Sequence, residues 1–283
     1  MAKAGTKTPS ARKAQLKRHA TSWCANLFGV ANVERWAEDP HQLQAYWPQS
    51  IWPWAQSVIV LGAQIYPSMI ETTPSVVYSE LYNTTNRMLD EIAYRVANEL
   101  NQQGFRAHFF PRDCYGDISV LVKKPEAAFS QVLAGLYAGL GTIGWNHTLL
   151  TKAYGPRVRL VSVITDAVLP PDPLMKKDLC RHCGLCVKHC PMKALTPPAA
   201  GEHVQVAEMD KHKCAQYHAQ LKSEFRYPCG RCAAVCPVGE DKKIYGAHAV
   251  SPEGIAHVQD FGSKNAVEDD PERNDRHRKV QVI

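Results

Sequence analysis

A run of closely spaced cysteines, CRHCGLCVKHCP at residues 180–191, constrains this chain more than any other feature. Cys180, Cys183, Cys186 and Cys190 have the C-x2-C-x2-C-x3-C-P spacing with which bacterial proteins bind paired iron–sulfur clusters. In that arrangement the fourth cysteine ligates the other cluster, which takes its remaining ligands from elsewhere in the chain. The run therefore predicts a second set of cysteines.

That second set lies downstream, in a single Cys214 and in the segment CGRCAAVCPVG at residues 229–239. Eight thiolates suffice for two four-iron clusters, because each iron of a cubane takes one soft, anionic ligand. The crossed arrangement assigns Cys180, Cys183, Cys186 and Cys236 to one cluster, and Cys190, Cys214, Cys229 and Cys232 to the other.

Zinc sites and disulfides are the alternatives to iron–sulfur ligation. Zinc favours two separate C-x2-C pairs over three ligands at three-residue spacing. Disulfides need an oxidising compartment, for which the sequence carries no signal. The two cysteines outside the runs, Cys24 and Cys114, are predicted to be buried or bystander thiols.

With 283 residues, 45% of them hydrophobic, the chain can form one large domain and a small one. Its net charge is +6, and several basic residues gather near the start: Lys3, Lys7, Arg12, Lys13, Lys17 and Arg18. They could contact RNA phosphates or an acidic electron donor, or form a solvated helix face. Without a membrane-length apolar segment or a hydrophobic signal core, we expect no membrane association and a cytoplasmic location.

The remaining sequence predicts an α+β chain in four parts. A mobile tail (1–10) precedes an α/β domain (11–168), a two-cluster domain (169–243) that opens with the linker LPPDPL, and an extended C-terminal tail (244–283). Alternating strands and helices predict an α/β sandwich for the larger domain. The predicted helices are one capped by Ser10, then 76–103 and 126–139, and the predicted strands are 26–33, 57–65, 105–110 and 157–165.

Two further segments are candidates for lining a cofactor site. Trp36, Trp47, Trp52 and Trp54 lie in an irregular stretch at 34–56, where they either line a cavity or pack in the core. The stretch AGLGTIGWNHTLL at 138–150 has three glycines that permit close approach of backbone amides to a ligand. As a phosphate-binding loop it is a weak signal, because its helix precedes the glycines.

Several segments together resemble the epoxyqueuosine reductase-like proteins, relatives of the reductive dehalogenases. They are LFGVANVERW, SVIVLGAQI, AGLGTIGWNHTLLT, YGPRVRLVSVITDAVLPPDP and the two cysteine runs, which cover roughly residues 16–240. The resemblance implies a nitroreductase-like α/β sandwich domain that holds cobalamin, followed by a ferredoxin-like domain with two [4Fe-4S] clusters. Reduced cobalamin would remove an oxygen or halogen substituent from an organic substrate.

The resemblance also implies partners and cofactor contacts. An external low-potential donor of the ferredoxin or flavodoxin type would supply the electrons. Asn146, Thr148, Thr151 and Tyr217 would contact the cofactor. We expect base-off cobalamin, because no histidine is clearly placed as a lower axial ligand; His147 is assigned a structural role.

The sequence departs from the family at three points. The position where the family carries a proton-donating aspartate holds Pro125, so Glu126, Tyr115 and Tyr137 are the candidate donors. Glu126 could instead be a residue at a helix N-terminus, favoured there by the helix dipole. The family's GKN reads Gly-Trp-Asn at 144–146, which could alter the floor of the pocket. No C-terminal helical repeat follows the clusters, which favours a small-molecule or nucleoside-type substrate over tRNA.

Two other functions remain open. The chain could be an electron-transfer or activating protein that reduces a separate corrinoid or redox partner, docking it through the basic N-terminal helix. It could also be a flavin-dependent reductase of the same fold, with FMN in place of cobalamin.

Overall fold

The computed structural model describes residues 7–38, 44–111, 113–199, 206–245 and 251–260, and it has a mixed α/β fold. Its centre is a four-stranded antiparallel sheet in the order β1-β2-β6-β3. The strands are β1 (Leu27–Asn32), β2 (Ser57–Gln64), β3 (Ala107–Phe110) and β6 (Val158–Thr165). All four predicted strands are therefore present, each within three residues of its predicted bounds.

Both faces of the sheet are covered, as the continuous apolar run of β2 predicts. Ile59 and Leu61 pack with helices α1 (Pro9–Ser22) and α4 (Val76–Gln102), while Val58 and Val60 pack on the other face beside α6 (Gln131–Tyr137). All four of these strand residues are completely buried. Alternate side chains of a strand point to opposite faces, so a strand buried on both sides is apolar at nearly every position.

The first helix begins earlier than predicted. Its N-cap is Thr8, whose hydroxyl accepts a hydrogen bond from the backbone N–H of Ala11 at 3.3 Å, and Pro9 occupies the first turn. A proline there loses no hydrogen bond, because the first N–H groups of a helix have no partner within it. The prediction of Ser10 as the cap was wrong, and Pro9 and Ser10 are helical rather than part of a tail.

The segment between β3 and the glycine-rich stretch also differs from the prediction. The helix expected over 126–139 is only α6 (Gln131–Tyr137), capped by Ser130, whose hydroxyl accepts from the N–H of Leu133. An unpredicted helix, α5 (Ile118–Lys123), precedes it and is capped by Asp117. Glu126 therefore lies in an irregular connection, and its assignment to a helix N-terminus was wrong.

The tryptophans take the core-packing alternative. Trp36, at the end of the 3-10 helix η1 (Val33–Trp36), is 2% exposed and contacts the rings of Phe129 and Tyr137 at 6.0 and 4.7 Å between centroids. Trp47, Trp52 and Trp54, near η2 (Gln44–Tyr46) and α2 (Pro48–Ile51), pack against the same core. The irregular loop is thus one wall of the hydrophobic core.

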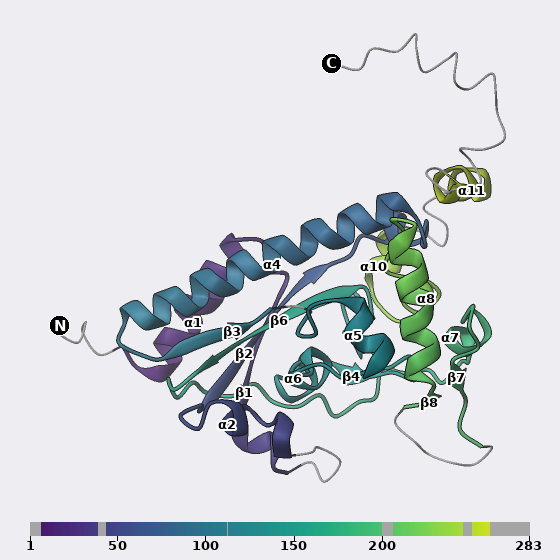
Figure 1. Ribbon diagram of the computed structural model, residues 1–283. Coiled ribbons are helices and arrows are strands. Elements are labelled where there is room, and N and C mark those ends of the chain that lie inside the picture. Colours follow the sequence, from purple (N-terminus) through teal and green to yellow (C-terminus); the bar gives the residue numbers. More distant parts are fainter. Residues whose placement is uncertain (1–6, 39–43, 112, 200–205, 246–250, 261–283) are drawn as a thin grey trace.

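The cysteine-rich part packs against one end of the sheet domain. The β4–β5 hairpin (Thr142–Ile143, Leu149–Leu150) precedes this part and packs on α6, and its Leu150 contacts Cys236 and Val238. The elements of the cysteine-rich part itself are α7 (Leu185–Lys188), β7 (Leu195–Thr196), β8 (Glu208–Met209), α8 (Lys211–Ser223), α9 (Arg231–Ala234) and α10 (Asp241–Tyr245). Helix α8 packs on α5, and α9 packs on α3 (Pro67–Ile70). In Figure 1 these elements gather at one end of α4, whereas α1 lies toward its other end.

A buried ion pair ties the two parts together. Arg157, just before β6, donates to both carboxylate oxygens of Asp241 at 2.6 and 2.7 Å. It also donates to the carbonyls of Cys236 at 3.1 Å and Val238 at 2.7 Å. Arg157 is fully buried, so removing either partner would leave an uncompensated charge in the core.

Beyond residue 250 the structure corrects the expectation of an extended tail. Residues Pro252–Asp260 form helix α11, and the Gln259 side chain donates to the carbonyls of Thr72 and Thr73 at 3.1 and 2.8 Å. The charged patches predicted at 268–270 and 276–279 lie outside the described residues. None of the helices in the described ranges is both long and apolar enough to cross a bilayer.

Candidate functional site

The glycine-rich stretch at 138–150 lets two backbone segments of the chain approach each other closely. Gly139 has φ +70°, and a Cβ there would lie 2.1 Å from the carbonyl oxygen of Pro173. A Cβ on Gly141 would lie 2.0 Å from the carbonyl oxygen of Leu150. These distances are far below van der Waals contact, so both positions require glycine. The glycines serve this backbone packing, and the phosphate-loop interpretation finds no support here.

Just beyond these glycines lies a small cavity, which we call the first cavity. Its lining includes four cysteines, Cys180, Cys183, Cys186 and Cys236. Burial raises the pKa of Cys186, and the neighbouring thiols of Cys180, Cys236 and Cys183 raise it further. The first cavity thus brings together the four cysteines that crossed ligation assigns to one cluster.

Two observations test whether a cluster fits there. No three cysteine, histidine or acidic side chains of the described residues converge on a single metal-ion position. The four sulfurs instead surround a cavity, which suits ligands that each bind a separate iron. In addition, the indole N–H of Trp145, another residue of the lining, is buried and has no hydrogen-bond partner among the described residues. A cluster sulfur would give this donor an acceptor.

A larger cavity of about 500 Å³, which we call the second cavity, is lined by the other four cysteines, Cys190, Cys214, Cys229 and Cys232. Burial first, and then the thiols of Cys229 and Cys190, raise the pKa of Cys214 to about 11. Burial and the neighbouring thiols also raise the pKa of Cys232. Metal binding must therefore displace protons from these thiols. Asn146 lines both cavities and lies at their boundary.

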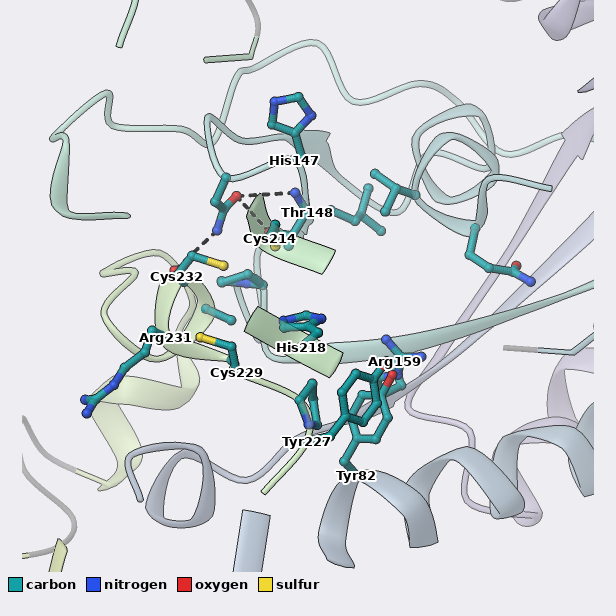
Figure 2. Close-up of a pocket in the computed structure, with 18 of the residues that line it drawn as sticks. Tyr82, His147, Thr148, Arg159, Cys214, His218, Tyr227, Cys229, Arg231 and Cys232 are labelled. Carbon is teal, nitrogen blue, oxygen red and sulfur yellow. Dashed lines mark hydrogen bonds between the residues drawn. The ribbon is translucent and has the colours of Figure 1, made fainter. Parts of the chain in front are cut away.

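The second cavity extends from these thiols to a group of polar and aromatic residues (Figure 2). The hydroxyls of Tyr115 and Tyr227 are hydrogen-bonded at 2.6 Å. Arg159 donates to Asp113 at 2.9 Å, and its guanidinium lies over the ring of Tyr82 at 4.4 Å. Burial raises the pKa of Tyr82, Tyr115 and Tyr227, so these hydroxyls keep their protons at neutral pH.

His218 lies between the thiols and this group in Figure 2. It comes from α8, and its ring meets that of Tyr227 edge to face, with the centroids 5.3 Å apart. Burial lowers the pKa of His218 to about 4, so the imidazole is neutral at physiological pH. Its ring makes no hydrogen bond within the described part of the chain, which leaves its nitrogens available to an occupant of the cavity.

Three of the four predicted cofactor-contact residues line the second cavity: Asn146, Thr148 and Tyr217. The Asn146 side chain accepts from the Thr148 hydroxyl at 2.8 Å and donates to the carbonyl of Cys232 at 3.3 Å (Figure 2). Thr151 is 1% exposed and lies outside the lining, where its hydroxyl accepts from the N–H of Tyr154 in a turn. His147 also borders the cavity, but its Nε2 lies 2.6 Å from the carbonyl of Ala207.

The structure places the three predicted proton donors in different surroundings. Tyr115 lines the second cavity, whereas Tyr137 is buried against Trp36 outside the lining. Glu126 is exposed; a hydrogen bond from Tyr46 and an ion pair with Lys124 at 3.0 Å lower its pKa. A donor acid must be protonated, and these contacts favour the carboxylate instead.

Other cavity residues were not among the candidates. They are Tyr82 from α4, Arg159 from β6, His218 from α8, and Asp113 and Tyr227 from two loops. Of these five, only Arg159 could have been suspected from the sequence, because a charged residue inside an apolar strand needs a buried partner. Of the two outlying thiols, Cys24 is exposed, while half-buried Cys114 lines the second cavity, where burial raises its pKa to about 11.

Comparison with known sequences agrees with the arrangement of the cysteines. A family described as the 4Fe-4S dicluster domain matches residues 179–240. The tetrachloroethene reductive dehalogenase of Desulfitobacterium hafniense is 32% identical over 197 residues, which are 64% of this chain and 32% of that protein. The epoxyqueuosine reductase of Synechococcus sp. (strain RCC307) is 26% identical over 227 residues, 74% of this chain and 65% of that enzyme. The chain thus spans about a third of the length of the dehalogenase.

Solved structures show the same fold at low identity. One is a reductive dehalogenase whose structure suggests a mechanism for B12-dependent dehalogenation. Its TM-score is 0.65 at 20% identity, over 95% of this chain and 38% of that one. Another is an epoxyqueuosine reductase with a modified tRNA-Tyr stem loop, with a TM-score of 0.56 at 19% identity, over 89% of this chain and 70% of that one.

Proposed function

We propose that this chain, which is similar in sequence to epoxyqueuosine reductases and reductive dehalogenases, is an iron–sulfur reductase. It passes electrons through two [4Fe-4S] clusters to a cobalamin held in a nitroreductase-like domain. The reaction is the reductive removal of an oxygen or halogen substituent from a small organic substrate. The observation that carries the proposal is the sorting of eight cysteines into two cavities, four to each.

The two cavities support an electron path with a direction. In the first, Cys183 is exposed to solvent. The second cavity contains both the other four cysteines and the space for an organic ligand. When bound, the clusters supply the route for single electrons and the cobalamin supplies a strongly reducing metal centre. The protein's own contributions are to hold these groups, to orient the substrate and to provide a proton.

The lining of the second cavity supports an organic cofactor. Its volume, about 500 Å³, lies within the range of small-molecule and cofactor sites, and its walls are mostly apolar and aromatic. Asn146, Thr148 and Tyr217 would contact the cofactor at the side of the cluster thiols. Neutral His218 offers a nitrogen to the occupant, although we keep the expectation of base-off cobalamin. Flavin, as FMN, is the alternative occupant.

Tyr115 is the proton donor that the cavity favours. Its hydrogen bond with Tyr227 fixes the ring, and burial raises the pKa of both phenols, so both remain protonated donors. Arg159 and Asp113 form an ion pair beside them, and a substrate there would meet charges that already balance each other. Such a site suits a neutral substrate that needs one proton on its leaving group.

Anaerobic purification followed by iron, sulfide and cofactor analysis tests the proposal. We expect about eight irons per chain and binding of added cobalamin, followed by its absorption spectrum. A colourless protein, or one that contains zinc, would contradict cluster ligation. Clusters without cobalamin binding would end the cobalamin assignment, and a flavin spectrum after reconstitution would replace it with FMN.

The electron-transfer alternative relied on docking through the basic N-terminal helix. Helix α1 lies toward the end of α4 away from α7 and α8 (Figure 1), so a partner bound there would be remote from both cavities. Two of its charges already have partners, because Lys13 pairs with Asp172 at 2.7 Å and Arg12 lies over Phe105. We therefore favour the reductase. Reductive turnover of a halogenated or epoxide substrate by the isolated, loaded protein would exclude the alternative.

A further inference from the structure

We propose that the surface around the exposed thiol of Cys183 is the docking site for a small acidic electron-donor protein. The inference rests on the part of the proposed function that concerns the first cluster, and it requires neither cobalamin nor a substrate. It moves the docking site from the basic N-terminal helix to residues 174–193, at the other end of the molecule (Figure 1).

The first support is charge. Residues 176–193 contain five lysine or arginine side chains against a single acidic one. The five are exposed: Lys176, Lys177, Arg181, Lys188 and Lys193. A net charge of +4 (five minus one) therefore falls within eighteen residues of a chain whose total is +6. Opposite potentials of this kind steer association and raise the encounter rate of two proteins.

The one acid in this segment is held by neighbouring groups. Asp178 accepts from the Thr142 hydroxyl at 3.1 Å and from the backbone N–H of Cys180 at 2.9 Å. Its other oxygen lies 3.3 Å from Nε2 of His182. The carboxylate is thus committed to fixing the loop that carries the first cysteine, and the surface that a partner meets is basic.

The second support is the position of this surface. Of the four cysteines of the first cavity, Cys183 is exposed, whereas Cys236 is buried. Electron transfer between proteins requires the two redox centres to approach closely, and this exposed edge is where a donor can come nearest. Leu174, 47% exposed, adds an apolar contact beside the charges. Small, partly polar interfaces are typical of transient redox complexes.

A basic surface could also bind RNA, but its placement favours a protein. An RNA substrate would have to present its base to the second cavity, where the organic ligand and the tyrosines lie. None of the five basic residues lines that cavity, whereas Arg181 lines the first. One of the charges thus borders the cavity through which electrons would enter, the other four lie on the same cysteine-bearing segment, and RNA binding becomes one outcome of the test.

The test uses the full chain with its clusters reconstituted. The test variant is Lys176→Glu/Lys188→Glu, and the matched control is Lys17→Glu/Arg18→Glu on exposed positions of α1, which changes the net charge by the same amount. Stopped-flow absorbance would follow cluster reduction by a photoreduced acidic flavodoxin over a series of ionic strengths. Photoreduced deazariboflavin, a small uncharged reductant, would measure the intrinsic reducibility of the clusters.

We expect the test variant to be reduced about tenfold more slowly by flavodoxin at low ionic strength, and the deficit to shrink as salt screens the charges. The control variant should stay within about twofold of wild type, and deazariboflavin should reduce all three proteins equally. Equal effects of the two variants, or a wild-type rate that salt does not change, would overturn the proposal.

Two outcomes distinguish this proposal from RNA binding and from a failure of the proposed function. If the test variant loses tRNA in a gel-shift assay while its reduction by flavodoxin is unchanged, the surface binds RNA and the docking proposal is wrong. If wild type assembles no cluster, as iron and sulfide analysis would show, the proposed function fails as well. Normal clusters with an unaffected flavodoxin rate would refute only the docking site.

Discussion

The two cavities have the same ligand chemistry in different surroundings. Each is lined by four cysteines. The first takes three from the run at 180–190 and Cys236 from the segment at 229–239, whereas the second combines Cys190, the single Cys214 and two cysteines of that segment. The first is small and borders solvent at Cys183, with Arg181 beside it, whereas the second is large, mostly apolar and lined by several tyrosines. The spacing of the cysteines predicts both cavities equally, so their difference in role comes from the surrounding fold.

The largest predicted effect tests whether each cavity holds its own cluster. Cys236→Ala should remove about half of the iron, because the cluster of Cys180, Cys183 and Cys186 loses a ligand. Cys183→Ala/Cys236→Ala should lose no more iron than either single variant, whereas Cys232→Ala/Cys236→Ala should lose nearly all of it. Iron analysis and electron paramagnetic resonance would measure this, with exposed Cys24→Ser as the control. Additive loss in the first pair would contradict the crossed ligation.

The next prediction concerns chemistry that only the second cavity should support. Tyr115→Phe should lower kcat about 100-fold or more, because general acids contribute on this scale. Tyr115→Phe/Tyr227→Phe should lower it further, since the remaining hydroxyl could otherwise donate. Cobalamin affinity should stay within about threefold of wild type, because the ring is retained. Tyr94→Phe, at an outward position 62% exposed, is the control. Unchanged kcat in the double variant would exclude both tyrosines.

The sequence predicted the parts of the fold whose signals are local. The apolar run at 57–65 forms β2, because a strand buried on both faces is apolar along its length. The amphipathic pattern after Ser75 forms α4, because a helix buried on one face repeats its apolar residues every three to four positions. Helix α5 was missed because six residues carry too short a pattern. Helix α6 was predicted too long because the irregular connection before it, which includes Glu126, reads as helical.

The residues of the site also divide into those with a local sequence signal and those without one. The grouping of the eight cysteines into two cavities could be predicted because cluster ligation requires a particular spacing, and cavity-lining residues such as Asn146 came from the family resemblance. Tyr227 and His218 could not be found, since Tyr227 meets Tyr115 only after the cysteine-rich part packs against the sheet, and His218 borders the site through its contact with Tyr227. Arg159 was the one detectable residue, as a charge in the strand at 157–165.

A smaller effect concerns the histidine of the second cavity. Burial lowers the pKa of His218 to about 4, so the unfolded chain, with an ordinary histidine, binds more protons at mildly acidic pH. Stability should therefore fall as the pH drops below about 6.5, and by pH 5 His218 alone should cost about 2 kcal/mol. Urea unfolding at pH 5–7.5 should show this loss in wild type and less of it in His218→Gln. His182→Gln, in the first cavity, is the matched control. Equal slopes in wild type and His218→Gln would show that His218 is solvated.

The smallest predicted effect belongs to the first cavity. The buried indole N–H of Trp145 has no partner in the described part of the chain and lies in the lining, so we expect it to donate to a sulfur of the first cluster. Such a bond stabilises the more negative, reduced state and raises the reduction potential.

Trp145→Phe keeps most of the ring but removes the donor, so the potential of the first cluster should fall by about 20–60 mV. This range follows from about 0.5–1.5 kcal/mol for a hydrogen bond and 59 mV per tenfold change for one electron. A redox titration followed by electron paramagnetic resonance would measure both clusters in one sample, with the second cluster as the internal control. A potential that does not move, or one that falls equally in both clusters, would mean that the indole acts only through packing. The difference between the cavities would then come from solvent exposure and charge alone.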